Sequence, residues 1–134
     1  MERIYETSVQ TIVLVDDDEA VRRLVSRILE REGYRVISAA SAAEGLEALD
    51  KCEGEADLLL TDVTLPGGID GIELGRRALE ACSDLKILCM SGYGESLEMD
   101  EDLARRASAA AYIGKPFAPG KLVSAVHDLI GASR

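Results

Sequence analysis

The 134-residue sequence lacks several features that would suggest a partner or a location. It has no excess of positive charge, because 15 Lys and Arg stand against 25 Asp and Glu, for a net charge of −10. Binding along a nucleic-acid backbone needs clustered Lys and Arg, so this composition argues against it. No apolar run approaches the length that crosses a membrane, and the first ten residues contain no apolar core of a secretion signal.

Cysteine pairs, repeats and linkers are also missing. Cys52, Cys82 and Cys89 are odd in number and form no C-x-x-C pair, which favours a reduced, cytoplasmic setting. No internal repeat or flexible linker divides the chain, and its length suits one domain rather than two. We therefore expect one domain at residues 11–131, after a leader at 1–10 and before a tail at 132–134.

Strand and helix patterns alternate along the chain. Short apolar runs predict strands at residues 11–15, 34–39, 57–61, 86–90 and 110–113. Amphipathic spacing and capping residues predict helices at residues 19–32, 41–51, 71–82, 96–107 and 121–130. This order predicts an α/β domain with helices on both faces of a parallel sheet. Right-handed crossovers favour a flavodoxin-like, doubly wound (βα)5 fold with strand order 2-1-3-4-5.

Polar residues follow four of the predicted strands, at the edge where ligands bind in such sheets. They are Asp16, Asp17 and Asp18 after the first strand, Asp62 after the third, Ser91 after the fourth and Lys115 after the fifth. The strand order places these groups close together, so we expect them to form one site.

The chemistry of this set is coherent. Neighbouring carboxylates repel one another and raise each other's pKa, so such a cluster usually needs a cation or the dipole of a helix N-terminus to be tolerated. Asp17 and Asp62, together with carbonyl and water oxygens, make an all-oxygen site suited to Mg²⁺. A carboxylate can attack phosphorus to form an acyl phosphate, and cations or hydroxyls such as those of Lys115 and Ser91 can hold phosphoryl oxygens. Asp18 is expected only to cap the helix that follows.

Four motifs in this order resemble the receiver domain of two-component response regulators. They are VDDD after the first strand, LLLTDVTLPGGIDGIEL around Asp62, MSG after the fourth strand and YIGKPF at the fifth. The resemblance covers about residues 10–131, and the LPGG loop resembles the variant often found in receivers fused to sensor kinases.

The resemblance implies roles for the matching residues. Asp62 would be the phosphoacceptor. Asp17 and Asp62 would ligate Mg²⁺ directly, Asp16 through water, and Thr64 through its backbone carbonyl.

Further implied roles concern phosphoryl contacts and signalling. Ser91 and Lys115 would contact the phosphoryl group, Tyr112 would be the conformational switch, and the Lys115–Pro116 bond would be cis. Thr64 and Tyr93 would flank the path of the hydrolytic water, and we expect Tyr93 to slow the loss of phosphate.

The resemblance also implies partners. A histidine kinase or histidine phosphotransfer protein would supply the phosphoryl group. The fourth helix, fifth strand and fifth helix would contact a downstream protein or a second copy. Nucleic acid, membrane and independent substrate turnover are not expected. Only four residues follow Ile130, so we expect no output domain in this sequence.

Two alternatives remain open on the residues alone. A haloacid-dehalogenase-like phosphatase also uses a strand-end Asp with Mg²⁺, and DDDEA mimics its D-x-D motif. Two residues after the second Asp of that motif, where the phosphatases usually have Thr or Val, this sequence has Ala20. The phosphatases also need a later acidic pair at a strand end, and the later acidic residues here fall in a predicted helix. We expect that acidic run to be a solvent-exposed face: Glu98, Asp100, Glu101 and Asp102. A pseudo-receiver acting only as an interaction module is the other alternative, and the complete polar set argues against it.

Overall fold

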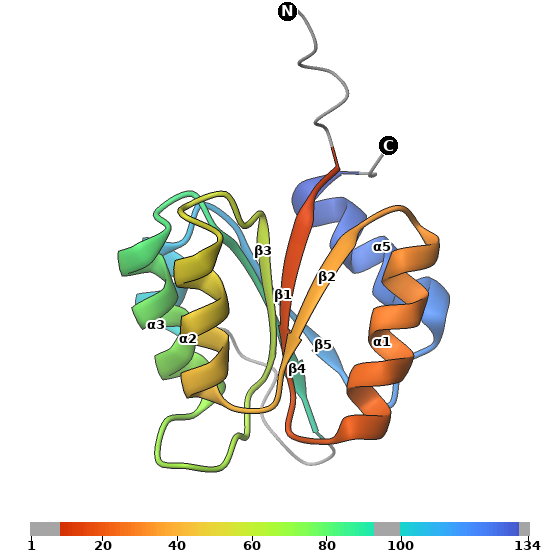
Figure 1. Ribbon diagram of the computed structural model, residues 1–134, viewed down its shortest axis with the longest axis horizontal. Helices are drawn as coiled ribbons and strands as arrows, with labels where there is room; N and C mark the ends of the chain where they lie inside the picture. The colour runs from red at the N-terminus through yellow and green to blue at the C-terminus, as the bar shows by residue number, and fades with distance from the viewer. Residues whose placement is uncertain (1–8, 93–99, 132–134) are drawn as a thin grey trace, which may run out of the picture.

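A parallel sheet forms the centre of the molecule (Figure 1). The computed structural model describes residues 9–92 and 100–131. The strands lie in the order β2-β1-β3-β4-β5, and each neighbouring pair is parallel. Their bounds are β1 Thr11–Val15, β2 Arg35–Ala39, β3 Leu58–Asp62, β4 Lys86–Ser91 and β5 Ala110–Gly114. The predicted flavodoxin-like topology is therefore confirmed.

Helices cover both faces of this sheet. They are α1 Glu19–Arg31, α2 Ala42–Lys51, α3 Gly71–Ala81, α4 Glu101–Arg106 and α5 Pro119–Ile130. In Figure 1, α2 and α3 lie on one side of the sheet and α1 and α5 on the other. Within the described residues, none of the helices is long and apolar enough to span a membrane.

The sheet divides the interior into two apolar layers. Every residue of β1 and β3 is buried, because these strands lie between other strands and beneath helices on both faces. Successive side chains alternate between the faces. Val13 and Leu59 therefore join the cluster under α2 and α3, while Ile12 and Leu58 join the cluster under α1 and α5. This packing holds the carboxyl ends of β1 and β3 side by side.

Side-chain caps set where the helices begin. Asp18 caps α1 by accepting hydrogen bonds from the backbone N–H groups of Ala20 and Val21, as predicted. At α2, Glu44 donates its backbone N–H to the Ser41 hydroxyl at 3.2 Å, and its carboxylate accepts from the Ala40 N–H at 2.9 Å. The loop before α1 is therefore short, and the three aspartates stay at the end of β1.

The predicted helix at 96–107 is corrected by the structure. Residues 96–99 lie outside the described residues, and α4 begins at Glu101. Asp100 has non-helical backbone geometry, with φ −60° and ψ 128°, and its carboxylate caps α4 by accepting from the Leu103 N–H at 3.0 Å. At the last helix the structure also differs, because α5 starts at Pro119 rather than at residue 121. Proline suits the first helical turn, where its missing N–H costs nothing.

The acidic run beside α4 is also corrected. Asp100 and Asp102 are not a freely solvated face, because both bind the guanidinium of Arg76 on α3. Each nitrogen–oxygen distance is 3.0 Å. Glu101 is exposed, as expected, and Glu98 lies outside the described residues. The run therefore attaches α4 to α3 instead of only facing water.

The start of α3 passes very close to the end of β3. The Gly71 N–H donates to the Val63 carbonyl at 2.7 Å. A β-carbon at Gly71 would lie 2.1 Å from the Asp62 backbone oxygen and 2.9 Å from the Val63 α-carbon. Only a residue without a β-carbon fits there, so Gly71 allows α3 to pack against the strand end that carries Asp62.

We expect Gly71→Ala to destabilise the domain by about 2 kcal/mol or more, because its methyl group would displace backbone rather than a mobile side chain. Gly120→Ala is the matched control: a β-carbon added at this position on α5 would meet nothing within 4 Å, and alanine favours helix. Urea denaturation of both variants measures the difference. Equal stability of the two variants would contradict the close approach at Gly71.

Candidate functional site

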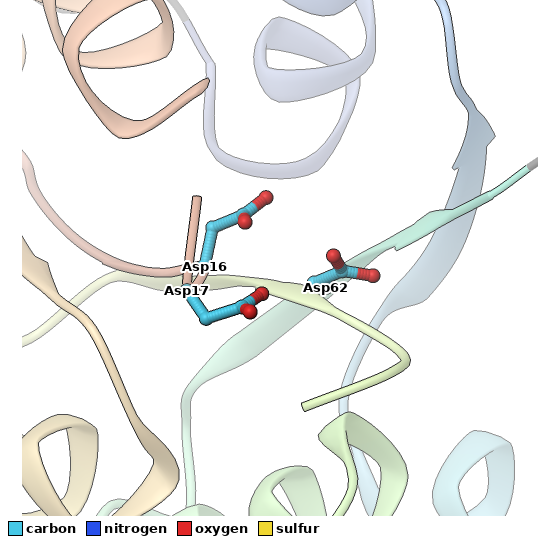
Figure 2. Close-up of side chains that lie close together, drawn as sticks. All are labelled: Asp16, Asp17 and Asp62. Atoms are coloured by element: carbon cyan, nitrogen blue, oxygen red, sulfur yellow. The ribbon is translucent and has the colours of Figure 1, made fainter. Parts of the chain in front are cut away.

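The three carboxylates predicted to form a site lie together at the ends of two neighbouring strands. Asp16 and Asp17 follow β1, and Asp62 ends β3, with Val15 and Thr61 paired in register just before them. Figure 2 shows the Asp16 and Asp17 carboxylates on the side facing Asp62. One oxygen from each carboxylate lies within 4.8 Å of the others.

Lys115 reaches this cluster from the end of β5. Its Nζ donates to Asp16 Oδ2 at 3.0 Å and to Asp62 Oδ2 at 2.9 Å. Its backbone N–H donates to the Ser91 carbonyl at 2.8 Å, which places it beside the end of β4. The Lys115–Pro116 peptide bond is cis, as the family resemblance implies. One ammonium thus lies between two of the three carboxylates.

Burial makes Asp62 chemically distinct from a surface aspartate. Its oxygens accept from the Thr64 N–H at 3.2 Å and from Lys115 at 2.9 Å, and the residue is 9% exposed. Burial raises the pKa of the Asp62 carboxyl above its ordinary value, and the nearby Asp16 charge adds to this effect. Lys115 and the Thr64 N–H act in the opposite direction without cancelling it. The ionised form of Asp62 therefore gains from an added cation.

Lys115 shows the reverse balance. Burial lowers the pKa of its ammonium, but hydrogen bonds and charges from Asp62 and Asp16 outweigh burial and raise it. Lys115 is therefore positively charged at neutral pH. It still offsets only one of the three carboxylate charges at the site.

The donor set fits a hard divalent cation. The three closest side chains offer only carboxylate oxygens, which Mg²⁺ prefers over nitrogen or sulfur ligands. The accessible Asp17 and the mostly buried Asp62 border the same space, so an ion reaching the cluster meets both. Asp16 is fully buried and already accepts from Lys115. The division between Asp17 and Asp62 as direct ligands and Asp16 as a water-mediated one stays a prediction.

The remaining predicted residues lie around the cluster at different depths. Ser91 is fully buried at the end of β4, and Thr64 is exposed beyond β3. Tyr112 is half-buried on β5, opposite Cys89 of β4. Burial raises the pKa of the Tyr112 hydroxyl, and a hydrogen bond from the Asp100 backbone opposes the shift. Tyr93 lies outside the described residues.

Sequence reasoning missed two arginines near these residues. Arg22, in the second turn of α1, donates from Nη1 to the Asp16 carbonyl at 2.7 Å. Arg76 on α3 forms an ion pair with Asp100, whose backbone hydrogen-bonds to the Tyr112 hydroxyl. The signal for Arg22 was its place one turn beyond the helix cap, close enough to reach back to the strand end. No local pattern could have paired Arg76 with a residue 24 positions away.

Comparisons with known proteins agree with this geometry. The family model described as response regulator receiver domain matches residues 12–127. The chain is 37% identical over 123 residues to the response regulator receiver protein CpdR of Brucella abortus (strain 2308), spanning 91% of this chain and 98% of that protein. A crystal structure of a CheY-like receiver domain protein from Methanospirillum hungatei JF-1 has a TM-score of 0.76 at 27% identity, covering 91% of this chain and 94% of that one. The chain belongs to the response regulator receiver domain family.

A longer relative shows another setting for the same domain. The chain is 36% identical over 123 residues to the sensor kinase CckA of Brucella abortus (strain 2308), spanning 90% of this chain but 12% of that kinase. Receiver domains act in phosphorylation-switched signalling, interact with histidine kinases or phosphotransfer proteins, and generally bind Mg²⁺ at an acidic pocket. The residues alone left a haloacid-dehalogenase-like phosphatase open as an alternative. The family match decides between the two in favour of the receiver domain.

We expect Asp62→Asn to raise the melting temperature of the metal-free protein by a few degrees near pH 7. Burial raises the pKa of Asp62, so the folded chain favours its protonated form. The protonated Asp62 side chain therefore stabilises the folded chain fully below the pKa that it has in the unfolded chain, about 3.9. This stabilisation is lost as the pH rises through the higher pKa of the folded chain. The advantage of asparagine should accordingly shrink as the pH falls toward about 3.

Thermal melts in a chelating buffer across the acid and neutral range test this expectation. Asp128→Asn on the exposed face of α5 removes the same charge away from the site and is the control. A lower melting temperature for Asp62→Asn than for wild type near neutral pH would show that its ion pair with Lys115 outweighs its burial.

Proposed function

We propose that Asp62 is the phosphoacceptor of a phosphorylation-switched receiver domain. The observation that carries the proposal is the double contact of Lys115 with Asp62 and Asp16, beside a third carboxylate within 4.8 Å. This arrangement holds one carboxylate oxygen of Asp62 next to a fixed positive charge at an accessible strand end. A histidine kinase or histidine phosphotransfer protein is the proposed phosphoryl donor.

The proposed reaction is a direct transfer from nitrogen to oxygen. An Asp62 carboxylate oxygen attacks the phosphorus of a phosphohistidine, the new P–O bond forms, and the P–N bond breaks. The bonding electrons leave with the histidine nitrogen, which takes a proton. Lys115 lies where it can hold a phosphoryl oxygen once its contact with Asp62 Oδ2 is exchanged. The buried Ser91 hydroxyl is the second proposed contact to the phosphoryl group.

The acidic cluster is the proposed Mg²⁺ site. Asp17, Asp62 and the Thr64 backbone carbonyl would hold the ion directly, and Asp16 would hold it through water. When bound, Mg²⁺ supplies positive charge that offsets both the carboxylates and the transferred phosphoryl group. The proposal is supported by the all-oxygen donor set and by the partial neutralisation that Lys115 alone achieves.

Three further features remain proposals. Thr64 and Tyr93 are the proposed positions that set the rate of phosphate loss, with Tyr93 shielding the acyl phosphate. We expect no turnover of an independent substrate. All three cysteines are free thiols, in keeping with the reduced, cytoplasmic setting that we expect.

Incubation with acetyl phosphate and Mg²⁺ should add one phosphoryl group to the chain, at Asp62. The reason is that the cluster supplies the nucleophile and Lys115 a fixed cation, so a small phosphodonor suffices. Intact-mass spectrometry measures the addition. Asp62→Asn should remain unlabelled, whereas Asp18→Asn, which keeps the α1 cap, should be labelled like wild type. Equal labelling of the Asp62→Asn variant would refute the assignment.

Contacts around α4 support Tyr112 as the proposed switch. The backbone of Asp100, which caps α4, contacts the Tyr112 hydroxyl, while the Asp100 carboxylate binds Arg76. Inside α4 only Leu103 is buried, where it packs against Gly75 of α3. Within the described part of the chain few apolar contacts hold so short a helix, so we expect a rotation of Tyr112 to shift it at low cost. The proposed output surface, for a downstream protein or a second copy, is formed by α4, β5 and α5.

Adding beryllofluoride, a phosphoryl mimic, with Mg²⁺ should change amide NMR shifts in residues 100–115 beyond the acidic cluster itself. The reason is that Ser91 would move toward the new acceptor oxygens and free space for Tyr112. Ser91→Ala should weaken these distant changes. Ser38→Ala, at an exposed position on β2, is the control and should not. Shifts confined to the loops of Asp16, Asp17 and Asp62 would show that the signal leaves by another face.

A further inference from the structure

Four hydrogen bonds fix the backbone and side chain of Asp16. Its N–H donates to the Ala39 carbonyl at 3.2 Å, and its carboxylate accepts from the Asp18 N–H at 2.9 Å and from Lys115 at 3.0 Å. The fourth bond comes from Arg22, whose Nη1 donates to the Asp16 carbonyl at 2.7 Å. Among the described residues, Arg22 is the hydrogen-bond partner of this carbonyl, whereas the N–H and the carboxylate of Asp16 are held by Ala39, Asp18 and Lys115.

Asp17 has no comparable support of its own. Its side chain is exposed, and within the described part of the chain no hydrogen bond or ion pair holds its carboxylate. The direction of this side chain therefore depends on the backbone that carries it. The Asp16 carbonyl and the Asp17 N–H belong to the same planar peptide unit, so fixing the carbonyl fixes the plane from which Asp17 projects.

We propose that Arg22 is a positioning residue for the metal ligand Asp17, acting through the Asp16–Asp17 peptide. This inference rests on the proposed Mg²⁺ site. Arg22 contacts neither the ion nor the phosphoryl group in this role. Its guanidinium holds the peptide so that the Asp17 carboxylate stays beside Asp16 and Asp62, within the 4.8 Å that the cluster spans. Without Arg22, the exposed Asp17 side chain samples directions that do not face Asp62, and ion binding must first restore the productive one.

Arg23 provides a comparison within the same helix turn. It carries the same charge one residue further on, but among the described residues its only ion pair is with Glu19, at 3.4 Å, through side chains that are 72% and 69% exposed. Such an exposed pair contributes little to stability. Replacing either arginine removes one positive charge near the acidic cluster, and only replacing Arg22 removes the support of the Asp16 carbonyl.

The sign of the effect separates positioning from simple electrostatics. If Arg22 acted only through its charge, removing it would reduce repulsion of the cation, and Mg²⁺ would bind more tightly. If Arg22 positions Asp17, removing it weakens Mg²⁺ binding despite the loss of a positive charge. Substitutions behind a metal ligand typically cost between about tenfold and a hundredfold in affinity.

Calorimetric titration of Mg²⁺ into wild type, Arg22→Met and Arg23→Met at constant ionic strength provides the test. We expect the Kd of Arg22→Met to rise by about tenfold and that of Arg23→Met to stay equal or fall slightly. Arg22→Lys keeps one donor and should recover part of the affinity. In acetyl phosphate labelling, Arg22→Met should need more Mg²⁺ but approach the wild-type rate at saturating Mg²⁺, because Arg22 does not contact the phosphoryl group.

The outcomes distinguish this inference from the proposed function. Wild-type binding with an unchanged or tighter Kd in Arg22→Met overturns the positioning role alone, as does an equal loss in Arg23→Met. No Mg²⁺ binding by folded wild type overturns the metal site and the role together. If circular dichroism shows that Arg22→Met is unfolded, Arg22→Lys against Arg23→Lys decides: a weaker Kd only in the former supports the role, and equal values overturn it.

Discussion

Mutual repulsion of the carboxylates at the carboxyl ends of β1 and β3 is the constraint on which the rest of this structure depends. Parallel pairing of β1 and β3 brings one carboxylate oxygen each of Asp16, Asp17 and Asp62 within 4.8 Å of one another. Burial, and to a smaller extent the Asp16 charge, raises the pKa of the Asp62 carboxyl. Lys115 relieves part of this repulsion from β5. The remaining negative charge fits the site to a divalent cation, and we propose that such a cation then helps to hold a phosphoryl group there.

The same arrangement links the site to a distant surface. The Lys115 N–H donates to the Ser91 carbonyl, so the end of β4 lies beside the end of β5, from which Lys115 reaches the cluster. Tyr112 lies three residues before Lys115 on that strand and contacts the start of α4, which Arg76 attaches to α3. We propose that a change at the carboxylates reaches α4 through these two neighbouring strands. The shortness of α4, in which Leu103 alone is buried, and its polar attachment to α3 agree with the moving role that we propose for it.

Much of this organisation was predictable from the sequence, because apolar runs and caps are local signals. The buried runs at 11–15 and 86–90 and the Asp18 cap gave correct elements, and strand order brought Asp16, Asp62 and Lys115 together as expected. The predicted start of α4 at residue 96 was wrong. Asp100 lies in a stretch whose composition suggested helix, yet it is the N-cap that precedes α4. The Arg76 contact with Asp100 depends on tertiary packing, which no periodic pattern encodes. The Arg22 contact with the Asp16 carbonyl is local, and its one signal was a position one turn beyond the helix cap. The roles assigned to Asp62, Ser91 and Tyr112 rest on chemistry and resemblance.

The central claim is that the carboxylate cluster is a cation site on which phosphoryl acceptance depends. The most direct test is the melting temperature of wild type and Asp17→Asn as the Mg²⁺ concentration is raised at constant ionic strength. A ligand that binds only the folded chain stabilises it progressively once its concentration exceeds the Kd. The melting temperature of wild type should therefore rise with added Mg²⁺, while that of Asp17→Asn should stay nearly constant. An unresponsive wild type, or an equal rise in both proteins, would contradict the account.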